Sequence, residues 1–106
     1  MYRITITAGT QYAGDGRILD PDERDTAIGV IRTSLAHTFG GFTEENSFGG
    51  WVKSGDTVTE IGKRWIVLSP TTGAARHIAQ SVAQELRQEA VALEIEPLEA
   101  AEIVSA

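Results

Sequence analysis

The chain begins with an alternation of apolar and polar residues. Tyr2, Ile4 and Ile6 fall on one side of an extended segment, with polar residues between them. This period of two, carried by β-branched residues, is typical of a half-buried strand. Residues 9–19 then include three glycines, which favour a loop with tight turns. We therefore predict a strand over residues 2–8 and a long loop after it.

The next apolar pattern has helical spacing and is bounded by residues that start and stop helices. Asp20 is placed as the N-cap and Pro21 at the first helical position. Gly40 follows as a stop, because glycine readily adopts the left-handed conformation that ends many helices. These signals predict a helix over residues 21–39. Its buried side carries Ile28, Ile31 and Leu35.

Aromatic and β-branched residues then predict a hairpin. Its first strand lies within residues 42–53, where the glycines at 49–50 mark a bulge or a close backbone approach. Its second strand runs over residues 57–69, with a bulge at Ile61-Gly62.

A second helix and a last strand complete the pattern. Thr71 or Thr72 is placed as the helix N-cap, and an apolar stripe follows at helical spacing from Ala75 to Leu86. Alternation returns over residues 90–96, which predicts a strand.

The predicted order of elements is β-α-β-β-α-β. With right-handed crossovers, this order gives a ferredoxin-like split βαβ sandwich of the α+β class, in which two helices cover one face of a four-stranded antiparallel sheet. We expect one such domain over residues 1–96 and an acidic tail over 97–106 that can form a short helix. The other face of the sheet is then open. We expect it to carry Arg3, Thr5, Thr7, Thr57, Thr59, Glu94 and Glu96.

Composition narrows the classes of function. The 106 residues include no Cys, which excludes disulfides, thiol catalysis and thiolate metal sites, and the two His residues are too far apart to predict a metal site. We expect no cofactor. Nine Lys and Arg against fifteen Asp and Glu give a net charge of −6, which argues against nucleic-acid binding.

The chain shows no membrane-spanning segment and no signal-peptide pattern, so we expect a cytoplasmic protein without membrane attachment.

Two weak candidate sites emerge from the residue pattern. Thr71, Thr72, Arg76 and His77 stand at the predicted start of the second helix, where hydroxyls, a guanidinium and free backbone N–H groups can bind a small anion. Residues 85–106 hold six Glu and one Arg, a net charge of −5. This acidic end is either a solubilising surface or a docking surface for a basic partner. The candidate partner-binding residues are Glu94, Glu96, Glu99 and Trp51.

One stretch of the chain carries a resemblance to known proteins. Gly40-Gly41-Phe42-Thr is followed by Gly49-Gly50-Trp51-Val52, then by Glu60 and by Trp65-Ile66-Val67. In this order the chain resembles small, uncharacterised ferredoxin-like proteins of bacteriophages and their bacterial hosts. The resemblance implies the same fold and brings no catalytic residues with it. A phage setting implies a small protein that binds and blocks a host or defence protein.

Three hypotheses from different classes follow. The first is a non-enzymatic binding module that forms a homodimer and acts on a protein partner, which the sequence does not identify. The second is a dimer that binds or sequesters a small molecule or nucleotide at the start of the second helix. The third is an enzyme similar to the dimeric α/β-barrel monooxygenases, with His37, Trp51 and Glu60 as its candidates in a cavity between helices and sheet. No residue is nominated as catalytic under the first two hypotheses, and enzyme activity stays open.

Overall fold

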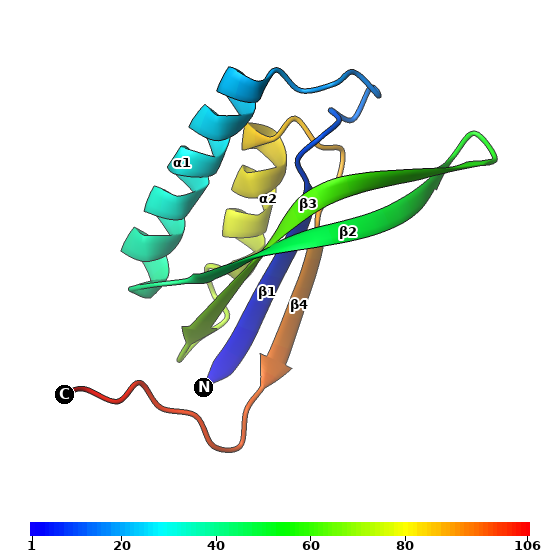
Figure 1. Cartoon of the computed structure of the whole chain (residues 1–106). Helices are drawn as coiled ribbons and strands as arrows, with labels where there is room; N and C mark the ends of the chain where they lie inside the picture. The colour runs from blue at the N-terminus through cyan, green and yellow to red at the C-terminus, as the bar shows by residue number, and fades with distance from the viewer.

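The computed structural model describes residues 1–106, and its elements follow the predicted order (Figure 1). The strands are β1 (Tyr2–Gly9), β2 (Thr43–Lys53), β3 (Asp56–Ser69) and β4 (Ala92–Pro97), and the helices are α1 (Pro21–Phe39) and α2 (Ala75–Glu85). Together they form the predicted α+β sandwich of ferredoxin-like type. Neither helix has the length and apolar character that crossing a membrane requires.

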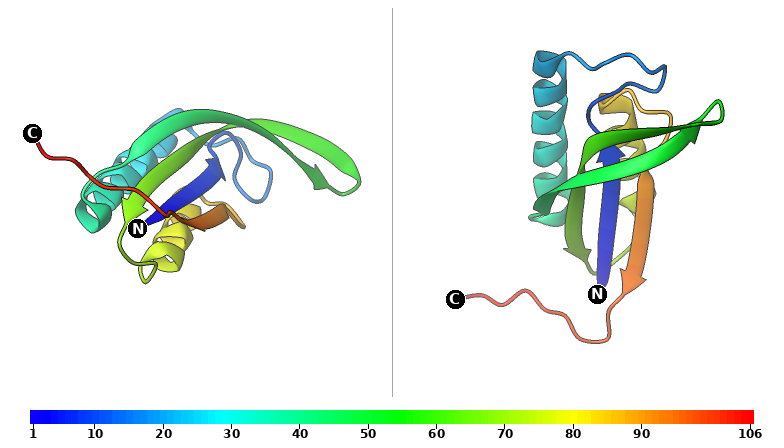
Figure 2. Two further views of the ribbon diagram at one scale, coloured as in Figure 1. Left: turned by 90° about the horizontal axis from the view of Figure 1, so that it is seen from below. Right: turned by 45° about the vertical axis from the view of Figure 1, so that its right-hand side comes forward.

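The four strands form one antiparallel sheet in the order β2-β3-β1-β4. β1 is central and pairs with β3 from Tyr2 opposite Ser69 to Gly9 opposite Gly62. Both helices cover one face of the sheet, and the turned views show the other face uncovered (Figure 2). Because side chains alternate between the two faces, Thr5 and Thr7 point away from the helices while Ile6 between them is buried.

The hydrophobic core fills the space between the helices and the sheet. Ile4 and Ile6 of β1 face Trp65 and Val67 of β3 in register, and all four are at most 3% exposed. The helices contribute Ala27, Ile28, Ile31, Leu35, Ala75, Ile78, Ala79, Val82 and Leu86. This packing agrees with the predicted apolar stripes of the two helices.

The predicted boundaries of α1 are confirmed. The Asp20 side chain accepts a hydrogen bond from the Glu23 backbone N–H at 3.2 Å, which is N-capping geometry. Gly40 ends the helix with φ 85°, and its N–H donates to the Ala36 carbonyl at 2.9 Å.

β2 and β3 are much longer than β1 and project beyond the body of the molecule as a hairpin (Figures 1 and 2). The overall extents are 46 × 29 × 22 Å. At the hairpin tip, Ser54 and Gly55 both have positive φ, at 52° and 85°, which is the two-residue turn that suits the twist of paired strands.

The predicted bulge at Ile61-Gly62 is wrong. Pairing with β2 continues without interruption, with Ile61 opposite Phe48 and Gly62 opposite Ser47. Gly62 serves a different purpose, because a Cβ at this position would overlap the Ala8 carbonyl of β1. The glycine therefore marks a close backbone approach within the regular sheet.

The open face also differs from the expectation in part. Arg3, Thr5, Thr7, Glu94 and Glu96 lie on it as predicted. Thr57 and Thr59 do not, because the register places them on the hairpin beyond β1 and on the opposite side of β3 from Glu60. Their places on the face are taken by Arg64, Ile66 and Leu68, of which the last two are half-buried.

The second helix begins later than predicted. Its N-cap is Ala74, with no side-chain hydrogen bond, so neither Thr71 nor Thr72 caps it. The hydroxyl of Ser69 instead donates to the Thr71 carbonyl at 2.7 Å, which holds this connection in a turn.

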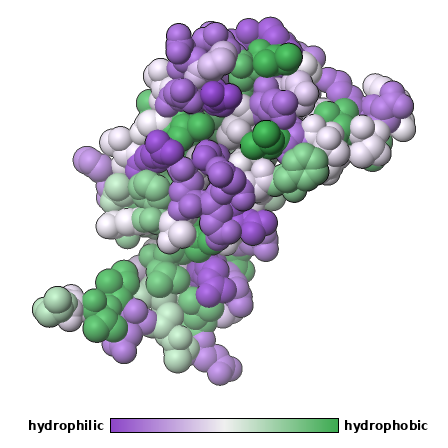
Figure 3. Space-filling view, viewed as in Figure 1, coloured by the Kyte–Doolittle hydropathy of each residue, from purple (hydrophilic) through white to green (hydrophobic).

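The tail forms no helix. Beyond Pro97 it has no regular secondary structure, and its start is held by a hydrogen bond from the Leu98 N–H to the Met1 carbonyl at 2.9 Å. Ile103 and Val104 are 71% and 79% exposed. Figure 3 shows apolar surface at the lower left, where the C-terminal tail lies in the same view of Figure 1. With few neighbours to pack on, the isolated segment lacks the tertiary contacts that stabilise short helices.

Candidate functional site

A cavity lies at one end of the open face, where the hairpin leaves the body. Its volume is about 520 Å³, within the range of small-molecule sites. Its walls come from the end of β1, the hairpin, the loop after β1 and the segment 88–92 that leads from α2 into β4. We call this cavity the Glu60 pocket, after its most buried charged residue.

Glu60 is 9% exposed and stands on β3 in the wall of this pocket. Its Oε1 accepts a hydrogen bond from Trp51 Nε1 at 3.2 Å, and its Oε2 accepts one from the Tyr12 backbone N–H at 3.3 Å. A buried carboxylate is costly unless such donors satisfy it. The two bonds also fix the direction of the carboxylate and the position of the Trp51 indole beside it.

Two glycines make room for this arrangement. A Cβ at Gly9 would overlap the Glu60 carboxylate, so glycine is the one residue that lets the carboxylate pack against the end of β1. Gly62, across from Gly9 in the sheet, allows the close approach of β3 to the Ala8 carbonyl. The missing side chains at these two paired positions hollow the sheet surface into a pocket.

The loop after β1 is fixed in place as a wall of the pocket. The Thr10 N–H donates to the Ile61 carbonyl at 3.1 Å and continues the contact between β1 and β3. The Gly14 N–H donates to the Arg87 carbonyl at 2.8 Å, and the Gln88 side chain donates to the Tyr12 carbonyl. The loop is thus tied both to β3 and to the segment after α2.

The lining of the pocket is negatively charged. It includes the carboxylates of Glu60 and Glu89 and contains no Lys, Arg or His. Apolar contact comes from Trp51 and Val91 and from several alanines. A wall with the buried carboxylate of Glu60 and the exposed Glu89 beside it favours a ligand that carries positive charge or donates hydrogen bonds.

A second polar cluster is structural. Glu44 at the start of β2 accepts two hydrogen bonds from the Arg32 guanidinium of α1, at 2.9 and 2.7 Å, and a third from Trp65 Nε1 at 2.7 Å. The Arg32 contacts lower the pKa of Glu44 to about 2, with Trp65 and Lys63 acting in the same direction against burial. This cluster ties α1 to the hairpin over the buried indole, and neither Glu44 nor Arg32 lines the Glu60 pocket.

The structure does not bring the predicted anion site near the Glu60 pocket. Thr71, Thr72, Arg76 and His77 are exposed around the start of α2, which follows the opposite end of the central strands. An anion site there stays a prediction.

The predicted partner-binding residues are also dispersed. Glu94 and Glu96 lie on the open face of β4, where Glu96 forms an ion pair with Arg3 at 3.0 Å, and Glu99 lies in the tail. Trp51 lies apart from them in the wall of the Glu60 pocket. Phe48 is on the other side of the hairpin from Trp51, so the two do not form an aromatic patch.

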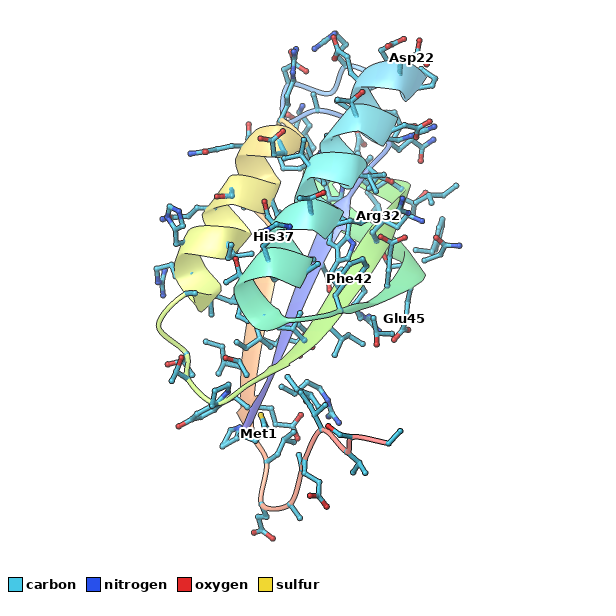
Figure 4. All side chains as sticks on the ribbon, turned by 90° about the vertical axis from the view of Figure 1, so that its left-hand side faces the viewer. Met1, Asp22, Arg32, His37, Phe42 and Glu45 are labelled. Carbon is cyan, nitrogen blue, oxygen red and sulfur yellow. The ribbon has the colours of Figure 1, made fainter.

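The sequence predicts part of the lining of this pocket. Trp51 and Glu60 are candidates of the enzyme hypothesis together with His37, but His37 is exposed on α1 (Figure 4) and does not line the Glu60 pocket. Gly9 and Glu89 were missed. The available signal was the pair of glycines at the end of one strand and in the middle of another, which indicates close backbone approach. No group of three His, Asp or Glu side chains is placed to hold a metal ion.

Comparisons with known proteins show the fold. No protein-family model and no curated protein matches the chain. Among solved structures, a phage SAM lyase in complex with S-methyl-5′-thioadenosine matches with a TM-score of 0.65 and 22% identity, over 90% of this chain and 79% of that one. The divalent cation tolerance protein CutA from Archaeoglobus fulgidus matches with a TM-score of 0.61 and 12% identity, over 96% and 88%.

A DUF3240 family protein from Shewanella baltica matches with a TM-score of 0.53 and 10% identity, over 98% of this chain and 97% of that one. These likenesses show that the chain has the fold of a small ferredoxin-like α+β protein. This is the fold that the sequence resemblance implied.

Proposed function

We propose that this protein binds an adenosine thioether or sulfonium, the ligand class of S-methyl-5′-thioadenosine and S-adenosylmethionine, in the Glu60 pocket. The observation that carries the proposal is the buried Glu60 carboxylate, held by Trp51 and by the Tyr12 N–H in the wall of a cavity of about 520 Å³. The named ligand of the phage enzyme with the same fold supports the choice of class.

The chemistry of the pocket suits such a ligand. A sulfonium is a cation, and the exocyclic amine of adenine is a hydrogen-bond donor, so both suit a wall with two carboxylates. The indole of Trp51 and the apolar residues beside it provide a surface for the adenine ring or the methylthio group. This assignment corresponds to our second hypothesis, at a different place from the one the sequence indicated.

Calorimetric titration with S-methyl-5′-thioadenosine and with S-adenosylmethionine tests the proposal. We expect both to bind, and Glu60→Gln to raise the Kd at least about tenfold, because a hydrogen bond to a charged group is lost. Glu45→Gln is the matched control, since Glu45 lies outside the lining of the pocket. Chromatography of the titrated samples shows whether S-adenosylmethionine remains intact or is cleaved, which separates a binding protein from an enzyme. No heat and no thermal shift with either ligand would refute the proposal.

We also infer that the protein forms a homo-oligomer, as the dimer hypothesis holds. Three large apolar residues of the hairpin support this inference, because Phe48, Val52 and Ile61 are 75%, 71% and 58% exposed. Exposed apolar groups at this density favour an interface. Light scattering of the purified chain measures the mass. A monomer mass at all concentrations would refute the homo-oligomer. The apolar surface of the hairpin would then be available to a different protein partner, as in our first hypothesis.

A further inference from the structure

A positive charge lies beside Trp51, which is one of the residues that line the Glu60 pocket. Lys53, the last residue of β2, places its ammonium group 5.9 Å from the centre of the Trp51 ring. The nitrogen of the same indole donates to Glu60. One aromatic side chain therefore has a carboxylate at its edge and a cation over its face.

Lys53 reaches from the hairpin toward the loop after β1. A Cβ at Gly16 of that loop would lie 3.1 Å from Lys53 Nζ, so the ammonium group sits against the loop backbone. Lys53 is half-buried and forms no ion pair within the chain. A half-buried cation without a carboxylate partner is open to an anionic group from outside the chain.

Charges of both signs therefore lie near Trp51, with Glu60 and Glu89 in the lining of the pocket and Lys53 near the hairpin tip, outside the lining. A ligand with a positive centre and a negative end matches this arrangement better than one with a single charge. Trp51 lies between the two charges, because its ring nitrogen donates to Glu60 and its ring faces the Lys53 ammonium group.

We propose that Lys53 binds the carboxylate of an amino-acid group on the ligand, so that the pocket prefers zwitterionic nucleosides to those without a carboxylate. This inference rests on the proposed function and specifies its ligand. Within the adenosine class, it favours S-adenosylmethionine over the same molecule lacking its carboxylate, decarboxylated S-adenosylmethionine. These two compounds share the sulfonium, the amine and the adenosine. A difference between their Kd values therefore reports the contribution of the carboxylate.

The test measures the Kd of both compounds for the natural chain and for Lys53→Gln, with chromatography to verify that each ligand is intact. We expect the natural chain to prefer S-adenosylmethionine roughly fivefold to tenfold, as for one charge-assisted contact. Lys53→Gln should lose this preference by weakening S-adenosylmethionine alone, and Lys53→Arg should retain much of it. Arg17→Gln is the matched control, because it removes the same charge from the exposed part of the neighbouring loop.

The outcomes separate this inference from the proposal it rests on. If Lys53→Gln weakens both compounds equally, or neither, Lys53 acts on the Trp51 ring or not at all, and the inference is wrong while adenosine binding stands. If Arg17→Gln reproduces the effect, general charge rather than Lys53 explains the preference, and the inference is also wrong. Absence of binding by every compound overturns both proposals.

Discussion

Replacing Glu44 by Gln should destabilise the protein in a way that depends on pH. The change keeps the shape of the side chain and an oxygen that can accept from Trp65, but it removes the charge that faces Arg32. The Glu44 side chain is 16% exposed, so the carboxylate is largely shielded from water, whereas its partner Arg32 is 48% exposed.

The magnitude follows from the pKa of Glu44, which falls from 4.5 to about 2 in the folded chain. Taken at face value, this shift corresponds to about 3 kcal/mol of stability at neutral pH. Because Arg32 is half exposed, water screens the pair, and we reduce the expected loss to about 1–2 kcal/mol. For a domain of this size, that loss lowers the Tm by roughly 4–12 °C.

The sign of the pH dependence is fixed by the direction of the shift. A carboxylate whose pKa is lowered by folding contributes its full stability above the unfolded value of 4.5 and loses it as the pH falls toward about 2. The difference in unfolding free energy between the natural chain and Glu44→Gln should therefore be constant from pH 7 to pH 5.5. It should then shrink steadily below that range.

Urea unfolding followed by circular dichroism at several pH values measures this difference. Glu45→Gln is the control, because Glu45 is exposed on the other face of β2 and has no hydrogen bond to α1. A difference between Glu44→Gln and the natural chain that is as large at pH 3 as at pH 7 would refute the electrostatic account. So would equal losses for the two variants at pH 7.

Two further predictions concern the pocket and the first helix. Gly9→Ala should raise the Kd of S-methyl-5′-thioadenosine at least about tenfold in calorimetry by displacing the Glu60 carboxylate, whereas Gly41→Ala, with open space at its Cβ, should bind as the natural chain does. Unchanged affinity in Gly9→Ala would mean that the carboxylate position does not matter for binding. Asp20→Ala should lower the unfolding free energy by about 1 kcal/mol in urea denaturation, because the Glu23 N–H loses its acceptor. Restoration by Asp20→Asn but not by Asp20→Leu would confirm that capping is the cause.

The sequence by itself determined the elements whose signals are local. The α1 helix begins and ends where the side chain of Asp20 and the left-handed backbone of Gly40 dictate, and both act within four residues. The apolar residues Ile4 and Ile6 predicted a half-buried strand because successive side chains of a strand point to opposite faces of the sheet. The local signal was misleading at Thr71, whose carbonyl accepts a hydrogen bond from the Ser69 hydroxyl. Thr71 therefore belongs to a turn, and the start of α2 has no side-chain cap.

The tertiary structure decided most of the pocket. Trp51 and Glu60 belong to one hairpin, so their proximity was within reach of sequence reasoning. Gly9 meets Glu60 through the β1–β3 register, and Glu89 joins them from the segment after α2, at separations along the chain that no local pattern encodes. The requirement for glycine at position 62 likewise comes from the Ala8 carbonyl of the neighbouring strand. Strand pairing creates these contacts only when the whole sheet forms, because the free energy that holds them comes from the core beneath.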